Sequence, residues 1–214
     1  KTLVIAYNGE IFNYKELRRE LIAKGYGFRT ESDTEVLLKG YEAYGKEILG
    51  KLNGMFSFVI YNPGENTVFA ARDHIGIKPL YYMNRSGALV IASEIKSIKI
   101  AVPNLEPDYE AIATPVHFQT SPRTGFKDIF KLEPGHYLEY KAAKLTISQY
   151  WDIQVKEEKQ LSFGEKQEKL DFLLNDAVRQ QMISDVPIGV LLSGGLDSSL
   201  IAALMRKNTN RTIN

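Results

Sequence analysis

The sequence predicts an α+β domain over residues 1–155, followed by the start of an α/β domain over residues 156–214. Three observations lead to this prediction. In the first part, two helix patterns precede a series of short β-type runs. In the second part, an apolar run, a glycine loop and a helix follow one another as in a parallel α/β unit. The charge run at residues 156–160 between them is typical of a solvated linker.

The chain begins with a strand and two helices. Residues 2–7 are typical of a buried strand, and Asn8-Gly9 is expected to lead out of it as a turn. Each helix pattern combines a cap residue, a Glu three positions later and a terminal Gly: Asn13, Glu16 and Gly25, then Ser32, Glu35 and Gly45. The predicted apolar faces consist of Leu17, Leu21 and Ile22 in the first helix, and Val36, Leu37, Gly40, Tyr41 and Tyr44 in the second.

The β-type runs that follow are expected to form hairpins. They comprise residues 55–61, 67–72, 79–83, 88–92 and 135–140, with turns at residues 62–64 and 84–87. A less regular stretch with several prolines precedes the last run. Together with the two helices, these runs predict one α+β unit that ends near residue 155.

The second domain is predicted to begin with a helix and a buried strand. Apolar residues recur at helical spacing over residues 170–182. Residues 186–192 form a continuous apolar run, which predicts a strand buried on both faces. The loop at residues 193–199 and a helix at residues 198–205 follow directly, so the loop is expected to join a parallel strand to a helix.

Composition limits the possible partners. The chain carries 27 basic and 26 acidic side chains, a formal net charge of +1, so nucleic acid is not an expected partner. Cysteine is absent, which excludes disulfides, thiolate metal sites and a cysteine nucleophile within these residues, and favours a cytoplasmic protein. No apolar stretch approaches membrane-spanning length, so no membrane partner is expected. The sequence opens within a strand and stops before a parallel sheet is complete, so we expect a fragment that lacks both ends.

The loop Ser193-Gly194-Gly195-Leu196-Asp197-Ser198-Ser199 has the features of an anion site. Its glycines let the backbone turn tightly, and the following helix presents unpaired N–H groups and its positive dipole end. The hydroxyls of Ser193, Ser198 and Ser199 add donors. Asp197 would repel a phosphate, so we expect it to hold Mg²⁺ that bridges phosphate oxygens. The alternative is a tight turn with a simple helix cap, but the position between an apolar run and a helix favours a nucleotide site.

This loop lacks the Lys of a Walker loop, and it resembles the pyrophosphatase-type loop of enzymes that cleave ATP to AMP and pyrophosphate, such as asparagine, argininosuccinate and GMP synthetases. A second pattern narrows the resemblance. Asn8-Gly9-Glu10 and Ser32-Asp33-Thr34-Glu35 each have a structural explanation, as a turn and a capping box. Together they resemble the amidotransferase half of the asparagine synthetase family. Further segments match it in order: residues 54–58, 71–82, 92–96, 134–137 and 184–187.

The resemblance implies both a fold and an activity. The implied fold is a class II glutamine amidotransferase, an incomplete Ntn-type αββα sandwich, followed by the start of an ATP-pyrophosphatase domain. The implied enzyme is a carbon–nitrogen ligase of asparagine biosynthesis that hydrolyses glutamine and passes the ammonia to an aspartyl-adenylate made from ATP. The implied products are asparagine, glutamate, AMP and pyrophosphate. Glutamine, aspartate, ATP and Mg²⁺ are therefore the expected small-molecule partners, and a homodimer is possible at full length.

The resemblance also assigns residues to each site. Asn8 and Gly9 would form the oxyanion hole for the glutamine amide. Glu10 and Asp33 would bind the α-ammonium of glutamine. Leu191 and Leu192 would flank the adenine or ribose, and the remaining ATP site would comprise Ser193, Gly194, Gly195, Asp197, Ser198 and Ser199. His74, His117 and His136, and the pair Arg72 and Asp73, are interpreted as structural.

The sequence also departs from that family. Its nucleophile is an N-terminal cysteine, and an arginine that fixes the glutamine carboxylate lies between that cysteine and the first residue here. Neither is present, so this chain alone is not expected to hydrolyse glutamine. Two alternatives remain open at this point. One is a β-lactam-synthetase-like or other amide-forming ATP ligase of the same superfamily, and the other is a non-catalytic nucleotide-binding module.

Overall fold

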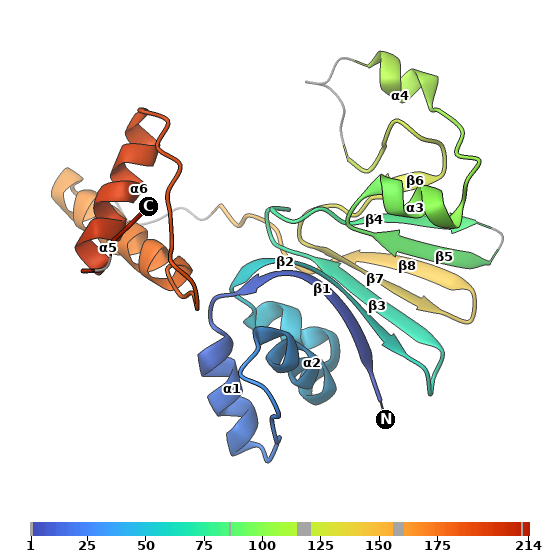
Figure 1. The fold of residues 1–214 in the computed structure, drawn as a ribbon, viewed down its shortest axis with the longest axis horizontal. Coiled ribbons are helices and arrows are strands. Elements are labelled where there is room, and N and C mark those ends of the chain that lie inside the picture. The colour runs from blue at the N-terminus through green and yellow to red at the C-terminus, as the bar shows by residue number, and fades with distance from the viewer. Residues whose placement is uncertain (1, 86, 115–120, 156–160, 211) are drawn as a thin grey trace. The chain divides into compact units, whose positions relative to one another are not determined.

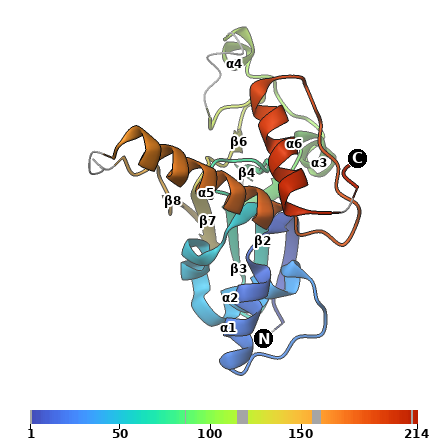
Figure 2. The same cartoon turned by 90° about the vertical axis from the view of Figure 1, so that its left-hand side faces the viewer.

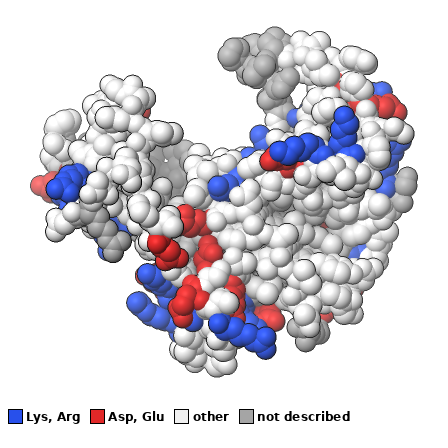
Figure 3. Space-filling view, in the orientation of Figure 1, with Lys and Arg blue, Asp and Glu red and all other residues white. Residues whose placement is uncertain are grey.

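The computed structural model describes residues 2–85, 87–114, 121–155, 161–210 and 212–214. The chain divides into two compact units, residues 1–153 and residues 154–214. Among the described residues, no helix is long and apolar enough to cross a membrane. On the face drawn in Figure 3, the charged side chains of the described residues form small groups of either sign, and they do not form a broad basic surface.

The first unit contains a five-stranded antiparallel sheet with helices on one face (Figure 1). Its strand order is β1 (Val4–Ile11), β2 (Gly54–Asn62), β3 (Thr67–Arg72), β7 (His136–Lys141) and β8 (Lys144–Gln149). The covering helices are α1 (Tyr14–Ala23), α2 (Asp33–Tyr44) and the 3-10 helix η1 (Gly45–Lys51). Since β1 is the first strand in this order, it has a free edge, and this edge carries the first candidate site.

A second sheet covers the other face of the first. Its order is β5 (Ala88–Ala92), β4 (Tyr81–Arg85) and β6 (Ile129–Lys131), and α3 (Ile95–Ala101) packs on its outer side. Figures 1 and 2 show the resulting order of helices, sheet, sheet and helix. The first unit is therefore an αββα arrangement.

Three apolar cores hold these layers together, and the alternation of strand residues produces them. Along β2, Phe56, Phe58 and Ile60 face α1 and α2, while Val59 faces the second sheet. The core between the sheets contains Ala70, Leu80, Tyr82, Leu132 and Leu138. The core beneath α3 contains Met83, Ile98 and Ile129.

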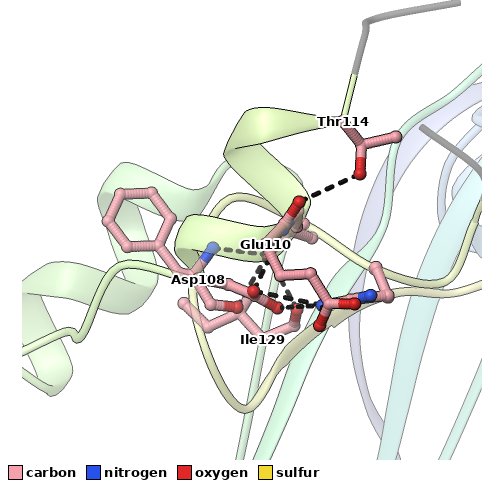
Figure 4. Close-up of polar contacts among 8 residues, drawn as sticks. Asp108, Glu110, Thr114 and Ile129 are labelled. Atoms are coloured by element: carbon pink, nitrogen blue, oxygen red, sulfur yellow. Dashed lines mark hydrogen bonds and ion pairs between the residues drawn. The ribbon is translucent and has the colours of Figure 1, made fainter. Parts of the chain in front are cut away.

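Several ion pairs join the described residues of the segment between α3 and β6. This segment contains the short helix α4 (Tyr109–Ala113), capped by the Asp108 side chain, which accepts from Ala111 N at 3.1 Å. Figure 4 shows the carboxylates of Asp108 and Glu110 turned toward one guanidinium, and Arg123 lies 2.9 and 3.0 Å from them. These bonds fix a segment that the sequence predicted only as irregular.

Arg72 and Asp73 are both buried at the end of β3, and backbone groups satisfy both charges. The guanidinium donates to the carbonyl oxygens of Gly76, Lys78 and Leu132, each at 2.7 Å. The carboxylate accepts from the amides of Ile77, Lys78 and Phe56 at 2.8, 2.9 and 3.2 Å. Burial lowers the pKa of Arg72 and the charge of Asp73 opposes that shift.

The predicted caps of α1 and α2 are only partly correct. Asn13 precedes α1, but its side chain instead donates to Lys51 O at 2.8 Å and accepts from Asn53 N at 2.9 Å. Ser32 caps α2 through Thr34 N, whereas Glu35 bonds to Arg29 and Thr30. Tertiary partners thus replace the predicted cap bond of Asn13, and the preceding loop replaces that of Glu35. Ile22 is also exposed, unlike the predicted apolar face of α1.

The hairpin predictions hold with shifted ends. Residues 67–72 and 88–92 form strands with the predicted bounds, and residues 55–61 lie within β2. The run at residues 79–83 begins its strand at Tyr81 and extends to Arg85, and the run at 135–140 is shifted by one residue to His136–Lys141. The sequence did not predict β6, β8, α3, α4 or η1.

The second unit consists of α5 (Phe163–Gln181) and α6 (Leu196–Asn208), which share a small core of Val178, Leu204 and Met205. The prediction of a buried strand at residues 186–192 is wrong. Leu191 is 96% exposed and Leu192 is 62% exposed. The segment makes two ladder bonds, from Val190 N to Asn214 O and from Asn214 N to Ile188 O. Two bonds to one residue are too few to establish a strand.

Candidate functional site

The first candidate site lies on β1, which continues through the segment predicted to be a turn. Asn8, Gly9 and Glu10 pair with Ser57, Phe56 and Met55 of β2. Glycine is required at position 9, because a Cβ there would lie 2.2 Å from Met55 O and 2.7 Å from Phe56 Cα. The Asn-Gly pair therefore permits close approach of two strands and is not a turn.

The hydrogen bonds around β1 show which backbone groups face its free edge. Phe12 N donates to Asn53 O at 2.8 Å, on the side of β2. Ile11 N donates to Asp33 Oδ2 at 3.0 Å, on the opposite side. Because N–H direction alternates along an antiparallel strand, Gly9 N–H points to the same free edge as Ile11 N–H. The predicted oxyanion donor and the predicted ammonium ligand thus share one edge.

Asp33 is the first residue of α2, and two β1 groups hold one of its oxygens. The Tyr7 hydroxyl donates to Oδ2 at 2.8 Å, beside the bond from Ile11 N. From the described residues, Oδ1 receives one longer bond, 3.4 Å from Thr34 Oγ1. Burial, followed by the hydrogen bond to Asp33, strongly raises the pKa of Tyr7, so its hydroxyl is a permanent donor.

Asn8 and Glu10 lie on the other face of β1 from Tyr7, because strand residues alternate. Asn8 Nδ2 lies 3.4 Å from Ser93 Oγ, which follows β5 in the second sheet. Ser57, opposite Asn8, is buried and its hydroxyl has no partner among the described residues. Glu10 and Asp33 therefore approach the free edge from opposite faces.

Sequence reasoning missed Tyr7 and Ser93. Tyr7 was assigned only to the opening strand, and Ser93 only to a matching segment. Had the strand been extended past Asn8, its two-residue period would have placed Tyr7, Gly9 and Ile11 on one face. No comparable sequence signal connects Ser93 with Asn8, since 85 residues separate them.

The second candidate site is the loop before α6. Gly194 has φ of +80°, a conformation that favours glycine. Ser193 Oγ lies 3.0 Å from Ser198 Oγ, and the hydroxyls of Ser198 and Ser199 donate to Gly195 O at 3.2 and 2.8 Å. These bonds close the loop on itself and hold the three hydroxyls together at the helix N-terminus.

Helix α6 begins at Leu196, two residues earlier than predicted, so Asp197 lies in its first turn. The first helical bond runs from Ser199 N to Gly195 O at 3.1 Å, and the preceding first-turn N–H groups have no intrahelical acceptor. Asp197 is exposed. No group of three His, Asp or Glu residues that could hold a metal occurs among the described residues.

His74 and His136 do not join either site. The His74 ring lies in a box of Tyr150, Trp151 and Phe56, with ring centroids at 5.5, 5.2 and 6.2 Å. Burial lowers the pKa of His74, which favours the neutral ring. His136 Nδ1 lies 2.7 Å from Pro134 O. His117 lies outside the described residues.

Two hollows of the structure lie away from the residues predicted for either site. One, of about 680 Å³, is lined by residues of the second unit from Arg179 to Asn214. The other, of about 660 Å³, lies between the start of β1 and α2 and includes Glu35. Asn8, Gly9 and Asp33 line neither of these two hollows.

Two family models match the chain. The model described as a glutamine amidotransferase domain matches residues 1–151, and the model described as asparagine synthase matches residues 169–214. These matches follow the order of the two structural units.

Curated relatives align with both parts. Asparagine synthetase [glutamine-hydrolyzing] 1 of Bacillus subtilis (strain 168) is 42% identical over 97% of this chain and 33% of its own length. Asparagine synthetase [glutamine-hydrolyzing] 3 of the same strain is 38% identical over 95% of this chain and 34% of its own length. A putative asparagine synthetase of Methanocaldococcus jannaschii is 36% identical over 97% and 41%, respectively. The chain thus spans about a third of the length of the first two relatives.

Solved structures support the fold. Glutamine phosphoribosylpyrophosphate amidotransferase from B. subtilis superposes with a TM-score of 0.53 at 20% identity, covering 96% of this chain and 44% of that one. A structure described as the allosteric regulatory enzyme of purine biosynthesis gives 0.52 at 21% identity, covering 99% and 44%. The fold is therefore that of an Ntn-type class II amidotransferase. The chain belongs to the glutamine amidotransferase domain family, and the relatives that align over both of its parts are glutamine-hydrolysing asparagine synthetases.

Proposed function

We propose that the protein containing this chain is a glutamine-hydrolysing asparagine synthase. One observation carries the glutamine half: Gly9 N–H and the Asp33 carboxylate share the free edge of β1. Gly9 N and Ile11 N are two residues apart, about 6.7 Å along a strand. The α-nitrogen and amide oxygen of extended glutamine are roughly 6 Å apart, given bonds of about 1.5 Å. An N–H donor and a carboxylate on one edge suit a ligand with a carbonyl at one end and an ammonium at the other.

In this proposal, each residue of the first site has a separate task. Gly9 N–H and the Asn8 carboxamide stabilise the negative oxygen that develops on the glutamine amide during attack. Asp33, with Glu10 approaching from the opposite face, binds the α-ammonium. The 214 residues contain no cysteine, so this chain supplies the donors and the pocket but not a thiolate.

We place the ATP site at residues 191–199. The exposed Leu191 and Leu192 contact the base or ribose, and the first turn of α6 with Ser193, Ser198 and Ser199 binds the pyrophosphate. Asp197, in the first turn of α6, would ligate Mg²⁺, which would neutralise phosphate charge. In the proposed reaction, aspartate is adenylated with loss of pyrophosphate, and ammonia then displaces AMP. In this proposal, residues 1–155 serve the hydrolysis of glutamine, and residues 156–214 begin the domain that carries out the adenylation and the amide formation.

The full-length protein tests the proposal. Aspartate, ATP and glutamine should yield asparagine, glutamate, AMP and pyrophosphate in equal amounts. Release of ADP in place of AMP would refute the nucleotide assignment. Asp33→Asn should raise KM for glutamine at least ten-fold, since a hydrogen bond to a charged group is lost. Asp128→Asn is the matched control, because Asp128 is exposed and its φ of +61° suits Asn. Equal KM values for both variants would refute the assignment of Asp33 to glutamine binding.

A further inference from the structure

Tyr7 is a residue to which neither the family matches nor the predicted site assigns a role. Its hydroxyl lies 2.8 Å from Asp33 Oδ2, and the same oxygen lies 3.0 Å from Ile11 N. The hydroxyl is therefore within about 6 Å of Ile11 N, although four residues of extended strand span about 13 Å. The Tyr7 side chain must lean along β1 toward Ile11.

This orientation takes the Tyr7 ring across position 9. Tyr7, Gly9 and Ile11 share one face of β1, and Gly9 has no side chain to block the path. The ring thus lies on the face of β1 that carries Ile11, and its hydroxyl bonds to Asp33. It reaches Asp33 from the β1 side, while the Asp33 backbone belongs to α2.

We propose that Tyr7 is a positioning residue of the glutamine pocket: with the Ile11 amide it fixes one Asp33 oxygen, so that the other faces the α-ammonium of the substrate. This inference rests on the proposed function. The asymmetry of the Asp33 contacts supports it, because Oδ2 has two short bonds and Oδ1 one of 3.4 Å. Without the hydroxyl, the carboxylate would retain only the Ile11 bond on Oδ2 and could rotate about its side-chain torsion.

Tyr7→Phe in the full-length protein removes the hydroxyl and keeps the ring. KM for glutamine should rise roughly five- to ten-fold, because one hydrogen bond to a charged group is lost. The kcat at saturating glutamine should change less than about two-fold. Synthesis supported by added ammonia, which bypasses the glutamine pocket, should keep its kinetic constants.

Tyr44→Phe is the matched control. Its hydroxyl also donates to a carboxylate at 2.8 Å, that of Glu20, away from β1. This variant should leave KM for glutamine unchanged. A second readout uses 4-carbamoylbutanoate, which is glutamine without the α-ammonium, as a competitor. Its inhibition constant should be the same for wild type and Tyr7→Phe, since Asp33 has no ammonium to bind.

Three results would overturn the inference. The first is an unchanged KM in Tyr7→Phe, and the second is an equal loss of affinity for the analogue. The third is a full additional effect of Tyr7→Phe in an Asp33→Asn background, where a residue that acts through Asp33 should add little. A wild-type protein that makes asparagine from ammonia but not from glutamine would instead refute the proposed glutamine site itself.

Discussion

Gly9 illustrates how a single residue makes the strand edge possible. Opposite residues in a non-hydrogen-bonded antiparallel pair approach to about 4.5 Å between Cα atoms, and Gly9 forms such a pair with Phe56. The space that a side chain would need is occupied by the backbone of Met55 and Phe56. A substitution cannot be absorbed by a side-chain rotation, so β1 and β2 would have to separate.

Gly9→Ala should therefore destabilise the first unit by about 1–3 kcal/mol, the usual cost of overpacking. Urea unfolding followed by fluorescence of Trp151, the sole tryptophan, measures this. Gly50→Ala is the control, because a Cβ there meets no atom within 4 Å, and its effect should stay within about 0.5 kcal/mol. Similar destabilisation by both variants would show that the strand contact does not matter.

The residues of the first candidate site could be predicted from the sequence, but the directions in which their side chains and N–H groups point could not. Asn8, Gly9 and Asp33 were identified because their order and spacing resemble the pattern of the amidotransferase half of the asparagine synthetase family. The turn expected at Asn8-Gly9 was wrong because pairing with β2 overrides the local preference of Asn-Gly. Tyr7 was missed for the same reason, since its role depends on a strand that continues to Ile11. Whether these residues bind glutamine stays a prediction.

At the scale of an element, hydrogen bonds from two helices fix the segment that leads into α2. Glu35 accepts from Arg29 N at 2.9 Å, Thr30 N at 2.7 Å and Thr30 Oγ1 at 2.6 Å. Arg18 holds the other side of this segment, with Nη1 2.6 Å from Thr30 O. The loop that ends at Asp33 is thus fixed from α1 and from α2.

Glu35→Ala should destabilise the first unit by about 1 kcal/mol through loss of these bonds and speed hydrogen exchange at the Arg29 and Thr30 amides. Hydrogen bonds from Thr30 and Arg29 lower the pKa of Glu35, so their contribution is complete above about pH 4.5 and is lost as pH falls below it. Glu42→Ala, which breaks a surface pair with Lys39 on the same helix, is the control. Unchanged exchange at both amides would contradict this account.

The segment at residues 186–192 shows where element prediction fails. Its apolar composition suits a buried strand, but a strand of a parallel sheet needs a neighbouring strand to pair with and layers that cover both of its faces. Among the described residues, Asn214 alone supplies ladder bonds, and Leu191 and Leu192 are exposed. The two helices on either side were predicted, because helical hydrogen bonds are local to each segment.

At the scale of the first unit, the fold joins distant segments at one end of the main sheet. His74 follows β3, and its ring packs against Phe56 of β2 and against Tyr150 and Trp151, which follow β8. Gly135 N donates to Asp73 O at 2.9 Å, and Tyr150 OH donates to Arg72 O at 2.8 Å. The sequence predicted α1, α2 and the strands β1 to β5 and β7 of this unit. It could not predict this closure, which depends on contacts between residues up to 78 positions apart.

This closure should make the stability of the first unit depend on pH. Burial lowers the pKa of His74 below its ordinary 6.5, and the nearby Asp73 charge opposes the shift only partly. The unfolded chain therefore binds a proton more readily than the folded one, so stability should fall as pH decreases below about 6.5. His74→Phe keeps an aromatic ring and removes the titration. Urea unfolding is followed by Trp151 fluorescence between about pH 5 and pH 7.5. As the pH is lowered, the urea midpoint should fall less steeply for the variant than for wild type. Only wild type has a ring at this position that can be protonated, so only its stability should respond to that protonation. Equal slopes for the two proteins would show that the charge on His74 does not affect folding.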